Sequence, residues 1–235
     1  MDPVAVENAV AVWFDNVFGS FDFSILSFYN NLHEGALGKV LDIFFLVYTH
    51  LGDDGILFIL LGLIFMLFKK TRKVGMGMLG GIIIGALITN VTIKPLIERP
   101  RPFELYEYLN NPNALLFRDW WISMGEVSAS SMRSFPSGHT TSAVAALVPV
   151  FLMTNKKKSW IVLVLAVLMG ASRNYVMVHY PSDVLGGIII GLIAGVISSV
   201  IIKVLFDKIT DRKNKVAVFL NEFDLSEKIK ARKKA

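Results

Sequence analysis

The chain has 235 residues, of which 54% are hydrophobic and 18% are charged, with a formal net charge of +5. A soluble domain is usually about 45–50% apolar, so this excess, concentrated in runs, indicates an integral membrane protein. The absence of cysteine excludes disulfides and thiolate metal sites. The modest positive charge indicates anchoring at the cytoplasmic side of a membrane rather than binding of nucleic acid.

The first 35 residues are predicted to form an interfacial or amphipathic segment. Their apolar stretch from Val4 to Phe18 is interrupted by acidic and amide side chains, as in helices that lie in the membrane surface. A second apolar stretch, Ala36 to Val47, carries only Lys39 and Asp42 as charged residues and is a candidate membrane span.

Five clearer apolar stretches follow along the chain, and each is predicted to be a transmembrane helix. Since about 20 residues cross the hydrocarbon core, the shortest of them must extend into their flanks. The expected fold is therefore all-α: a polytopic transmembrane helical bundle of five or six spans over residues 36–206, followed by a basic cytoplasmic tail, 207–235. The five stretches are 56–68, 74–93, 140–153, 160–178 and 184–206.

Basic clusters follow the first, third and fifth of these stretches. Because these are alternate spans, the clusters fall on one face of the membrane, and the positive-inside rule makes that face cytoplasmic. The opposite face then holds residues 94–139 and 179–183. The clusters are Lys69, Lys70, Arg72 and Lys73; Lys156, Lys157 and Lys158; and Lys203, Lys208, Arg212, Lys213 and Lys215.

Three polar stretches lie at the ends of spans on that opposite face. Lys94, Arg101 and Arg173 bring three cations to similar depth, where ionisable groups are costly and are therefore functional candidates. A guanidinium presents a planar fork that suits phosphate or carboxylate. The stretches read KPLIERPRPF (94–103), PSGH (136–139) and SRNYVMVHYPSD (172–183).

The second stretch is predicted to form an anion-binding helix start. The chain from Thr140 onward has helical character, which places the amides of Gly138 and His139 at a helix N-terminus, where anions bind. The hydroxyl of Ser137 adds a further donor. With the three cations, these groups predict an oxyanion cradle of the size of a phosphoryl group.

Two histidines accompany the predicted cradle. Imidazole acts as a nucleophile or as a proton donor near neutral pH. Asp183, four residues after His179, can fix the tautomer of that ring, as an aspartate does in the serine hydrolase triad. His179 is therefore the predicted nucleophile. His139, without an obvious acidic partner in the sequence, is the predicted general acid, and Asp183 is also expected to cap the last helix.

The combined pattern resembles the type 2 phosphatidic acid phosphatase (PAP2) superfamily, which includes bacterial lipid phosphatases and, more distantly, vanadium haloperoxidases. The pattern is K-x6-RP at Lys94–Pro102, PSGH at 136–139 and SR-x5-H-x3-D at 172–183, and all three motifs are complete. The resemblance covers residues 55–206 and makes residues 36–206 the expected catalytic domain.

The resemblance implies a role for each motif residue. His179 would attack phosphorus to form a phosphohistidine, and Asp183 would orient its ring. His139 would protonate the leaving group and then activate the hydrolytic water. No metal or other cofactor would be needed, since three cations neutralise the phosphoryl charge. The phosphoryl oxygens would be held by Lys94, Arg101, Ser137, Gly138 and Arg173.

The implied function is a metal-independent phosphatase of the cell membrane that acts on a lipid phosphate or pyrophosphate at the extracytoplasmic face. Undecaprenyl pyrophosphate is the expected substrate, with phosphatidylglycerophosphate and phosphatidate as alternatives. A non-catalytic protein that binds or transports lipid phosphates is the rival class, although binding alone would not need both histidines and the aspartate. Haloperoxidase activity is disfavoured by the spans. Membrane lipids are expected partners, nucleic acid is not, and no oligomeric state is predicted.

The remaining polar residues of these stretches have simpler interpretations. Arg99 is interpreted as an anchor at the membrane interface. Glu98 is expected to pair with a nearby cation, without a catalytic role. His33 and His50 match no motif and are interpreted as structural or surface residues.

Two glycine-rich runs, 75–90 and 186–195, lack the context of a phosphate-binding loop and predict close helix packing through small residues. Three aromatic residues between the first two motifs predict an interfacial belt or a lid, with a gate for lipid entry as the alternative. They are Phe117, Trp120 and Trp121.

Overall fold

The computed structural model describes residues 9–104, 113–129, 133–211 and 215–232, and every regular element within these ranges is helical, as predicted. The ends of the predicted N-terminal segment and of the tail, with Arg212 and Lys213, lie outside the described residues. The elements are α1 (Ala9–Asn31), α2 (Gly35–Leu51), η1 (Asp53–Gly55), α3 (Ile56–Met66), α4 (Arg72–Ala86), η2 (Leu87–Ile93), α5 (Lys94–Ile97), α6 (Ala114–Ser123), α7 (Gly138–Met153), α8 (Lys156–Ser159), α9 (Ile161–Tyr175), α10 (Pro181–Thr210), α11 (Lys215–Glu222) and α12 (Leu225–Arg232).

Two helices are long and apolar enough to cross a membrane: the continuous stretch Arg72–Ile97 and α10. The pair α2 and α3, bent by 48°, makes a third if it is one span. The helices α7 and α9 have 16 and 15 residues, about 24 Å of rise, which is shorter than the hydrocarbon core of about 30 Å. The protein is therefore a membrane protein with two or three such helices among its described residues, and the predicted number of five or six spans is not confirmed.

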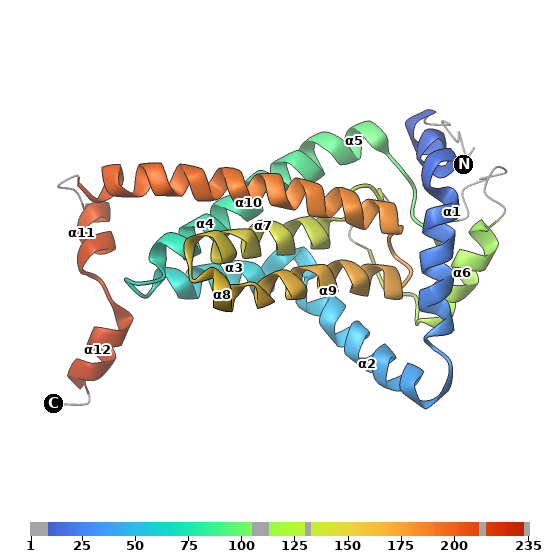
Figure 1. The fold of residues 1–235 in the computed structure, drawn as a ribbon, viewed down its shortest axis with the longest axis horizontal. Coiled ribbons are helices and arrows are strands. Elements are labelled where there is room, and N and C mark those ends of the chain that lie inside the picture. The colour runs from blue at the N-terminus through green and yellow to red at the C-terminus, as the bar shows by residue number, and fades with distance from the viewer. Residues whose placement is uncertain (1–8, 105–112, 130–132, 212–214, 233–235) are drawn as a thin grey trace.

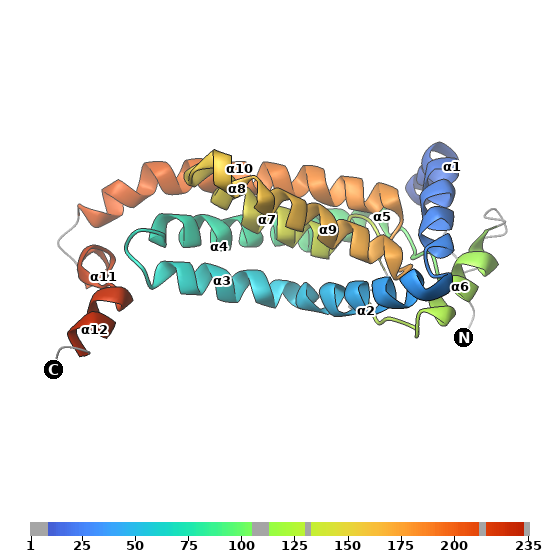
Figure 2. The same ribbon diagram turned by 60° about the horizontal axis from the view of Figure 1, so that its bottom comes forward.

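The centre of the bundle is α7, against which α4, α9 and α10 pack (Figures 1 and 2). The contact is close because glycines of α4 and α10 face α7: a methyl group on Gly191 would lie 2.6 Å from Cβ of Val144, and one on Gly81 would overlap the carbonyl of Ala145. The predicted packing of both glycine-rich runs through small residues is confirmed.

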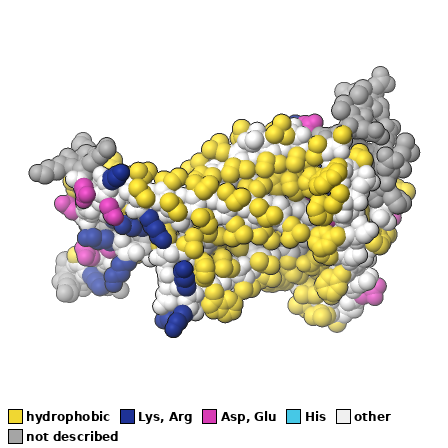
Figure 3. All heavy atoms as spheres, turned by 45° about the horizontal axis from the view of Figure 1, so that its top comes forward, with side chains coloured by type: hydrophobic (Ala, Val, Ile, Leu, Met, Phe, Trp, Pro, Cys, Tyr) yellow, Lys and Arg dark blue, Asp and Glu magenta, His cyan; other side chains and the backbone are white. Residues whose placement is uncertain are grey.

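The described basic clusters share one end of the bundle. Lys69, Lys73 and Lys203 line one hollow with Thr154, which lies two residues before α8 and its three lysines. Figure 3 shows the same segregation: Lys and Arg gather at one end, and hydrophobic side chains cover the long body of the visible face. The described clusters therefore lie together, as the alternation of spans predicted.

The other end of the bundle is crossed by α1, with α6 beside it (Figures 1 and 2). Leu26 of α1 is fully buried and forms one apolar cluster with Phe117 of α6 and with Met177 and Tyr180 from the connection between α9 and α10. Phe117 is only 2% exposed, so its assignment to an interfacial belt is wrong. The aromatic residue instead secures α6 to the bundle.

The first motif lies where a long helix changes its winding. Between α4 and α5, residues Leu87–Ile93 form a π-helix. Pro95 explains this change, because it has no amide hydrogen to donate and its ring clashes with the carbonyl four residues earlier. Glu98 ends α5 in the left-handed conformation, with φ of 47°, and turns the chain back across the bundle end.

Candidate active site

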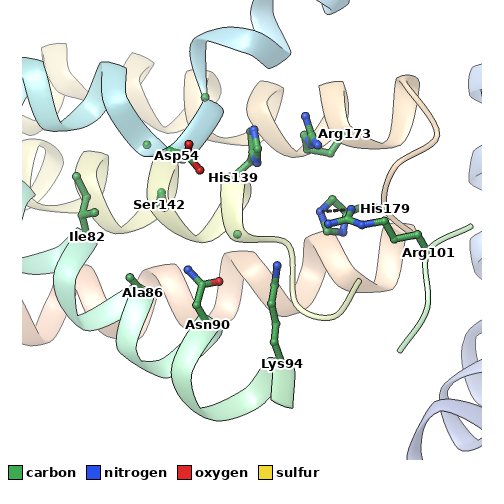
Figure 4. A pocket seen from close by; sticks show the side chains of 13 residues that line it. Asp54, Ile82, Ala86, Asn90, Lys94, Arg101, His139, Ser142, Arg173 and His179 are labelled. Carbon is green, nitrogen blue, oxygen red and sulfur yellow. Dashed lines mark hydrogen bonds between the residues drawn. The ribbon is translucent and has the colours of Figure 1, made fainter. Parts of the chain in front are cut away.

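A cavity of about 140 Å³ opens at the end of the bundle opposite the lysine clusters (Figure 4). It lies where α5, the start of α7, the end of α9 and the loop before α10 converge. Ser137 and Asp183 are fully buried behind its wall. The structure thus brings six of the eight predicted site residues onto one surface: Lys94, Arg101, Gly138, His139, Arg173 and His179.

The three cations of the cavity are buried, with exposures of 6% for Lys94 and 2% each for Arg101 and Arg173. Arg101 donates from Nη1 to the carbonyl of Val178 over 2.6 Å, and Arg173 from Nη1 to Oγ1 of Thr49 over 2.6 Å. Nε of Arg173 has no hydrogen-bond partner among the described residues. Three buried cations on one wall are costly without negative charge nearby, so this wall is suited to an anion.

A carboxyl group that the sequence analysis did not identify lies beside Arg101. Glu104 is 6% exposed, and its Oε2 accepts a hydrogen bond from the backbone amide of Arg101 over 3.2 Å. Burial raises the pKa of Glu104 to about 7. Burial also lowers the pKa of Arg101 to about 10, which still leaves the guanidinium charged at neutral pH.

His179 presents one nitrogen to the cations and the other to Asp183. Its Nε2 lies 3.2 Å from Nη1 of Arg101, and because a guanidinium only donates, this nitrogen is the acceptor. Nδ1 then carries the proton and faces Oδ2 of Asp183 over 3.4 Å. Burial, together with the charge of Arg101, holds the pKa of His179 well below its usual value. At neutral pH the ring is therefore uncharged, and the lone pair of Nε2 accepts the hydrogen bond from Arg101.

Asp183 is held from several directions. Its Oδ1 accepts from Nη1 of Arg99 over 2.9 Å, and its Oδ2 accepts from the amide of Tyr180 over 2.9 Å and from the hydroxyl of Ser134. Tyr180 is the N-cap of α10, so Asp183 stabilises the helix start from the third helical position rather than as the N-cap itself.

His139 has an acidic partner, and its expected lack of one is wrong. Nε2 of His139 lies 2.9 Å from Oδ1 of Asp53, and the other oxygen of Asp53 lies 2.9 Å from Nδ1 of His50. Side-chain exposures are 49% for Asp53 and 57% for His50. The sequence did not predict this partner, because Asp53 lies in the sequence GDDG, which indicates only a turn.

The helix start at α7 has the predicted form. Ser137 is its N-cap, and Oγ accepts hydrogen bonds from the amide of Thr140 over 3.5 Å and from the Thr140 hydroxyl over 2.9 Å. A methyl group built on Gly138 would still be 3.9 Å from Nζ of Lys94. Glycine therefore leaves open space between the helix start and that ammonium group.

Two neighbours of the first motif have definite partners. Arg99 is fully buried and pairs over 2.9 Å with each of three carboxylates, Asp15, Asp22 and Asp183. Its assignment as an anchor at the interface is wrong. Glu98 pairs with Arg133 over 2.6 Å at the surface, as expected.

Among residues 9–104, 113–129, 133–211 and 215–232, no three His, Cys, Asp or Glu side chains are grouped as a metal site. The cavity is lined by three cations, which suit an anionic ligand, and by the carboxylate of Asp54. The arrangement can hold a phosphoryl group beside a neutral imidazole.

Comparison with known families agrees with this chemistry. The family described as the PAP2 superfamily matches residues 75–207. The chain is 32% identical over 126 residues to an undecaprenyl-diphosphatase of Sulfolobus acidocaldarius, covering 53% of each protein. It is 33% identical over 151 residues to phosphatidylglycerophosphatase B of Bacillus subtilis, covering 59% of this chain and 64% of that protein. The matched part thus spans between half and two thirds of these relatives.

Solved structures show the same architecture over a larger part of the chain. Aquifex aeolicus LpxE superposes with a TM-score of 0.57 at 26% identity, covering 75% of this chain and 93% of the other. A transmembrane PAP2-type phosphatidylglycerolphosphate phosphatase from Bacillus subtilis superposes with a TM-score of 0.57 at 28% identity, covering 88% and 94%.

Proposed function

Because the chain belongs to the PAP2 superfamily, we propose that it hydrolyses the terminal phosphate of a membrane lipid phosphate or pyrophosphate. One observation carries this proposal. Three buried cations and a buried imidazole line the same cavity of about 140 Å³. A phosphoryl group there neutralises the cations.

In the first step, Arg101 donates to the phosphoryl oxygens instead of to Nε2 of His179. The freed lone pair on Nε2 attacks phosphorus, and the bond from phosphorus to the leaving oxygen breaks. The leaving oxygen takes a proton from protonated His139. Asp183 keeps the Nδ1 proton of His179 in place and stabilises the positive charge that develops on the ring. The products of this step are a phosphohistidine and the departed lipid alcohol or lipid phosphate.

In the second step, neutral His139 takes a proton from a water molecule, whose oxygen attacks phosphorus. The bond from Nε2 to phosphorus breaks, phosphate leaves, and both imidazoles return to their starting forms. Lys94, Arg101 and Arg173 hold the equatorial oxygens in both steps, with the hydroxyl of Ser137 and the amide of Gly138.

Burial disfavours the charged form of the His139 ring, and Asp53 acts against this effect. His139 shares the cavity with Arg101 and Arg173, whose positive charges oppose protonation of the ring. The carboxylate of Asp53, 2.9 Å from Nε2 of His139, opposes that effect and favours the imidazolium. We assign Asp53 as a positioning residue for His139.

The cavity accommodates a phosphate head group, and its volume leaves the lipid chain outside, along the apolar surface of the bundle. Undecaprenyl pyrophosphate is the preferred substrate, since the relative from Sulfolobus acidocaldarius is named undecaprenyl-diphosphatase. Phosphatidylglycerophosphate is the alternative, supported by the name of the Bacillus subtilis relative.

The arrangement of charge supports a location in the cell membrane. The lysine-rich end is assigned to the cytoplasm and the cavity to the extracytoplasmic face, with five or six spans between them once α7 and α9 extend into their flanks. Residues 36–206 form the catalytic unit in this assignment. Residues 1–35 lie at the membrane interface, and residues 207–235 form the cytoplasmic tail.

A turnover assay on a panel of lipid phosphates tests the function. Purified full-length protein is expected to release phosphate from undecaprenyl pyrophosphate or phosphatidylglycerophosphate, and His179→Gln is the inactive control. Binding of both lipids without phosphate release would favour the rival class, a lipid-phosphate binding or transport protein.

A further inference from the structure

Arg99 organises a buried polar network behind the cavity, outside the set of motif residues. Nη1 donates to Oδ1 of Asp183 over 2.9 Å and to Oγ of Ser182 over 2.7 Å. Nη2 donates to Asp22 and Asp15 over 2.9 Å each. We call these five residues the Arg99 network. It joins α1 to the carboxylate that faces the proposed nucleophile.

The network determines how Asp183 is oriented. A carboxylate has two oxygens, and Arg99 occupies Oδ1, so that Oδ2 is left toward Nδ1 of His179. The guanidinium is also stacked on the ring of Tyr180, 3.9 Å from its centroid, which restricts its movement. Rotation of Asp183 would break a buried charged contact, so the orientation is strongly favoured.

Asp22 makes the link to α1 through two separate contacts. Its Oδ1 accepts from the amide of Ser182 over 2.8 Å, and its Oδ2 accepts from the Ser182 hydroxyl over 2.7 Å as well as from Arg99. Ser182 lies in the first turn of α10, where amides lack partners within the helix and negative charge is favourable. Asp22 therefore fixes both Arg99 and the helix start that carries Asp183.

Packing of α1 does not depend on this aspartate alone. Leu26, one turn further along α1, is fully buried against Phe117, Met177 and Tyr180. Phe14 packs on Phe135, with ring centroids 4.4 Å apart. Apolar contacts thus secure α1 on both sides of Asp22. Attachment of α1 to the bundle therefore does not by itself explain why a carboxylate is buried at this position.

We propose that Asp22 of α1 is a positioning residue for His179, acting through Arg99 and Asp183. This inference rests on the proposed phosphatase function. It makes α1 part of the reaction apparatus rather than a segment at the membrane interface only. Loss of the Asp22 charge should slow the chemical step and leave the phosphate-binding cations unchanged.

The test compares Asp22→Asn with wild-type protein, using undecaprenyl pyrophosphate and phosphatidylglycerophosphate as substrates and orthovanadate as a probe of the cavity. The expected result is a fall in kcat of about 10- to 100-fold, as for other residues that orient a reacting group, with less than about a twofold change in KM and in vanadate inhibition. Asp22→Glu should recover part of the rate. Asp119→Asn on the exposed side of α6 is the matched control.

A double-mutant cycle separates positioning from stability. If Asp22 acts through Arg99, then Arg99→Lys should lower kcat similarly, and the double variant should lose no more than the worse single variant. Leu26→Ala weakens the packing of α1 without touching a network residue, so it should lower the melting temperature and retain most of kcat.

The outcomes distinguish the two claims. No turnover of either lipid by wild-type protein overturns the proposed function and the positioning role together. Turnover by wild-type protein with kcat unchanged in Asp22→Asn overturns the positioning role alone. If Asp22→Asn fails to fold, the kcat values of Asp22→Glu and Arg99→Lys test the positioning role instead. Wild-type kcat in both of these variants would also overturn the positioning role.

Discussion

The two histidines of the cavity differ in how their carboxylates are held. His179 faces Asp183, which is fully buried and fastened through Arg99 to two further carboxylates of α1. His139 faces Asp53, which is half-exposed and bonded on its other side to the exposed ring of His50. One imidazole is thus held by a rigid buried network and the other by a short chain open to solvent.

The difference matches the two proposed roles. A nucleophile must keep a fixed direction of attack and a fixed tautomer, which favours a buried, multiply bonded carboxylate. A general acid that later acts as a base must exchange its proton in every turnover, which favours contact with groups that equilibrate with water. The surroundings of each carboxylate therefore distinguish the two histidines better than the rings themselves do.

The strongest test of this contrast is the pair His179→Gln and His139→Gln. We expect His179→Gln to lose about 10⁴-fold or more in kcat with every substrate, because no attacking nitrogen remains. His139→Gln should lose about 10²- to 10⁴-fold with lipid substrates. With p-nitrophenyl phosphate, whose leaving group needs no proton, formation of the phosphoenzyme should be nearly restored in His139→Gln alone. Equal loss in both variants with that substrate would contradict the division of roles.

An intermediate effect is expected at Asp53. Asp53→Asn removes the charge that favours the imidazolium of His139, so we expect kcat to fall about tenfold with lipid substrates. The acid form of His139 should persist only to lower pH, so the alkaline decline of kcat should begin at lower pH than in wild type. Asp54→Asn is the neighbouring comparison, because Asp54 lines the cavity and makes no contact with His139 in the described hydrogen bonds. A pH profile identical to that of wild type would remove Asp53 from the mechanism.

The smallest expected effect concerns how the stability of the protein depends on pH through Glu104. Burial raises its pKa from 4.5 to about 7, so the folded state binds the proton more tightly than the unfolded state. The resulting stabilisation is present below pH 4.5 and is lost as the pH rises through 7. Glu104→Gln mimics the protonated acid at every pH and should raise the melting temperature at pH 8.5 but not at pH 4.5. An equal shift at both values would contradict the assigned pKa.

The sequence motifs predicted which residues come together at the cavity wall, and the reason is physical. Lys94, His139 and His179 each lie at the end of an apolar helix, and helix ends at one membrane face must meet. The all-helical fold followed from the same apolar runs. The number of spans stays a prediction, because α7 and α9 are shorter than the membrane and their apolar residues also bury against neighbouring helices.

The partners behind the wall were not predictable in the same way. Asp53 is 86 residues from His139 in sequence, and Asp22 is 160 residues from Ser182. Side-chain pairing over such separations depends on how helices pack and has no local pattern. One signal was present: acidic residues within the apolar N-terminal stretch, such as Asp15, are costly unless they are paired. Arg99 is the buried partner of Asp15.

The direct test of the mechanism is to locate the phosphate on the trapped enzyme. His139→Gln should accumulate the intermediate from p-nitrophenyl phosphate, because it lacks the base that activates water. After a denaturing quench at alkaline pH, mass spectrometry and ³¹P NMR should find an acid-labile phosphate on Nε2 of His179. Phosphate on any other residue, or release of p-nitrophenol at the wild-type rate with His179 unmodified throughout, would contradict the proposed nucleophile.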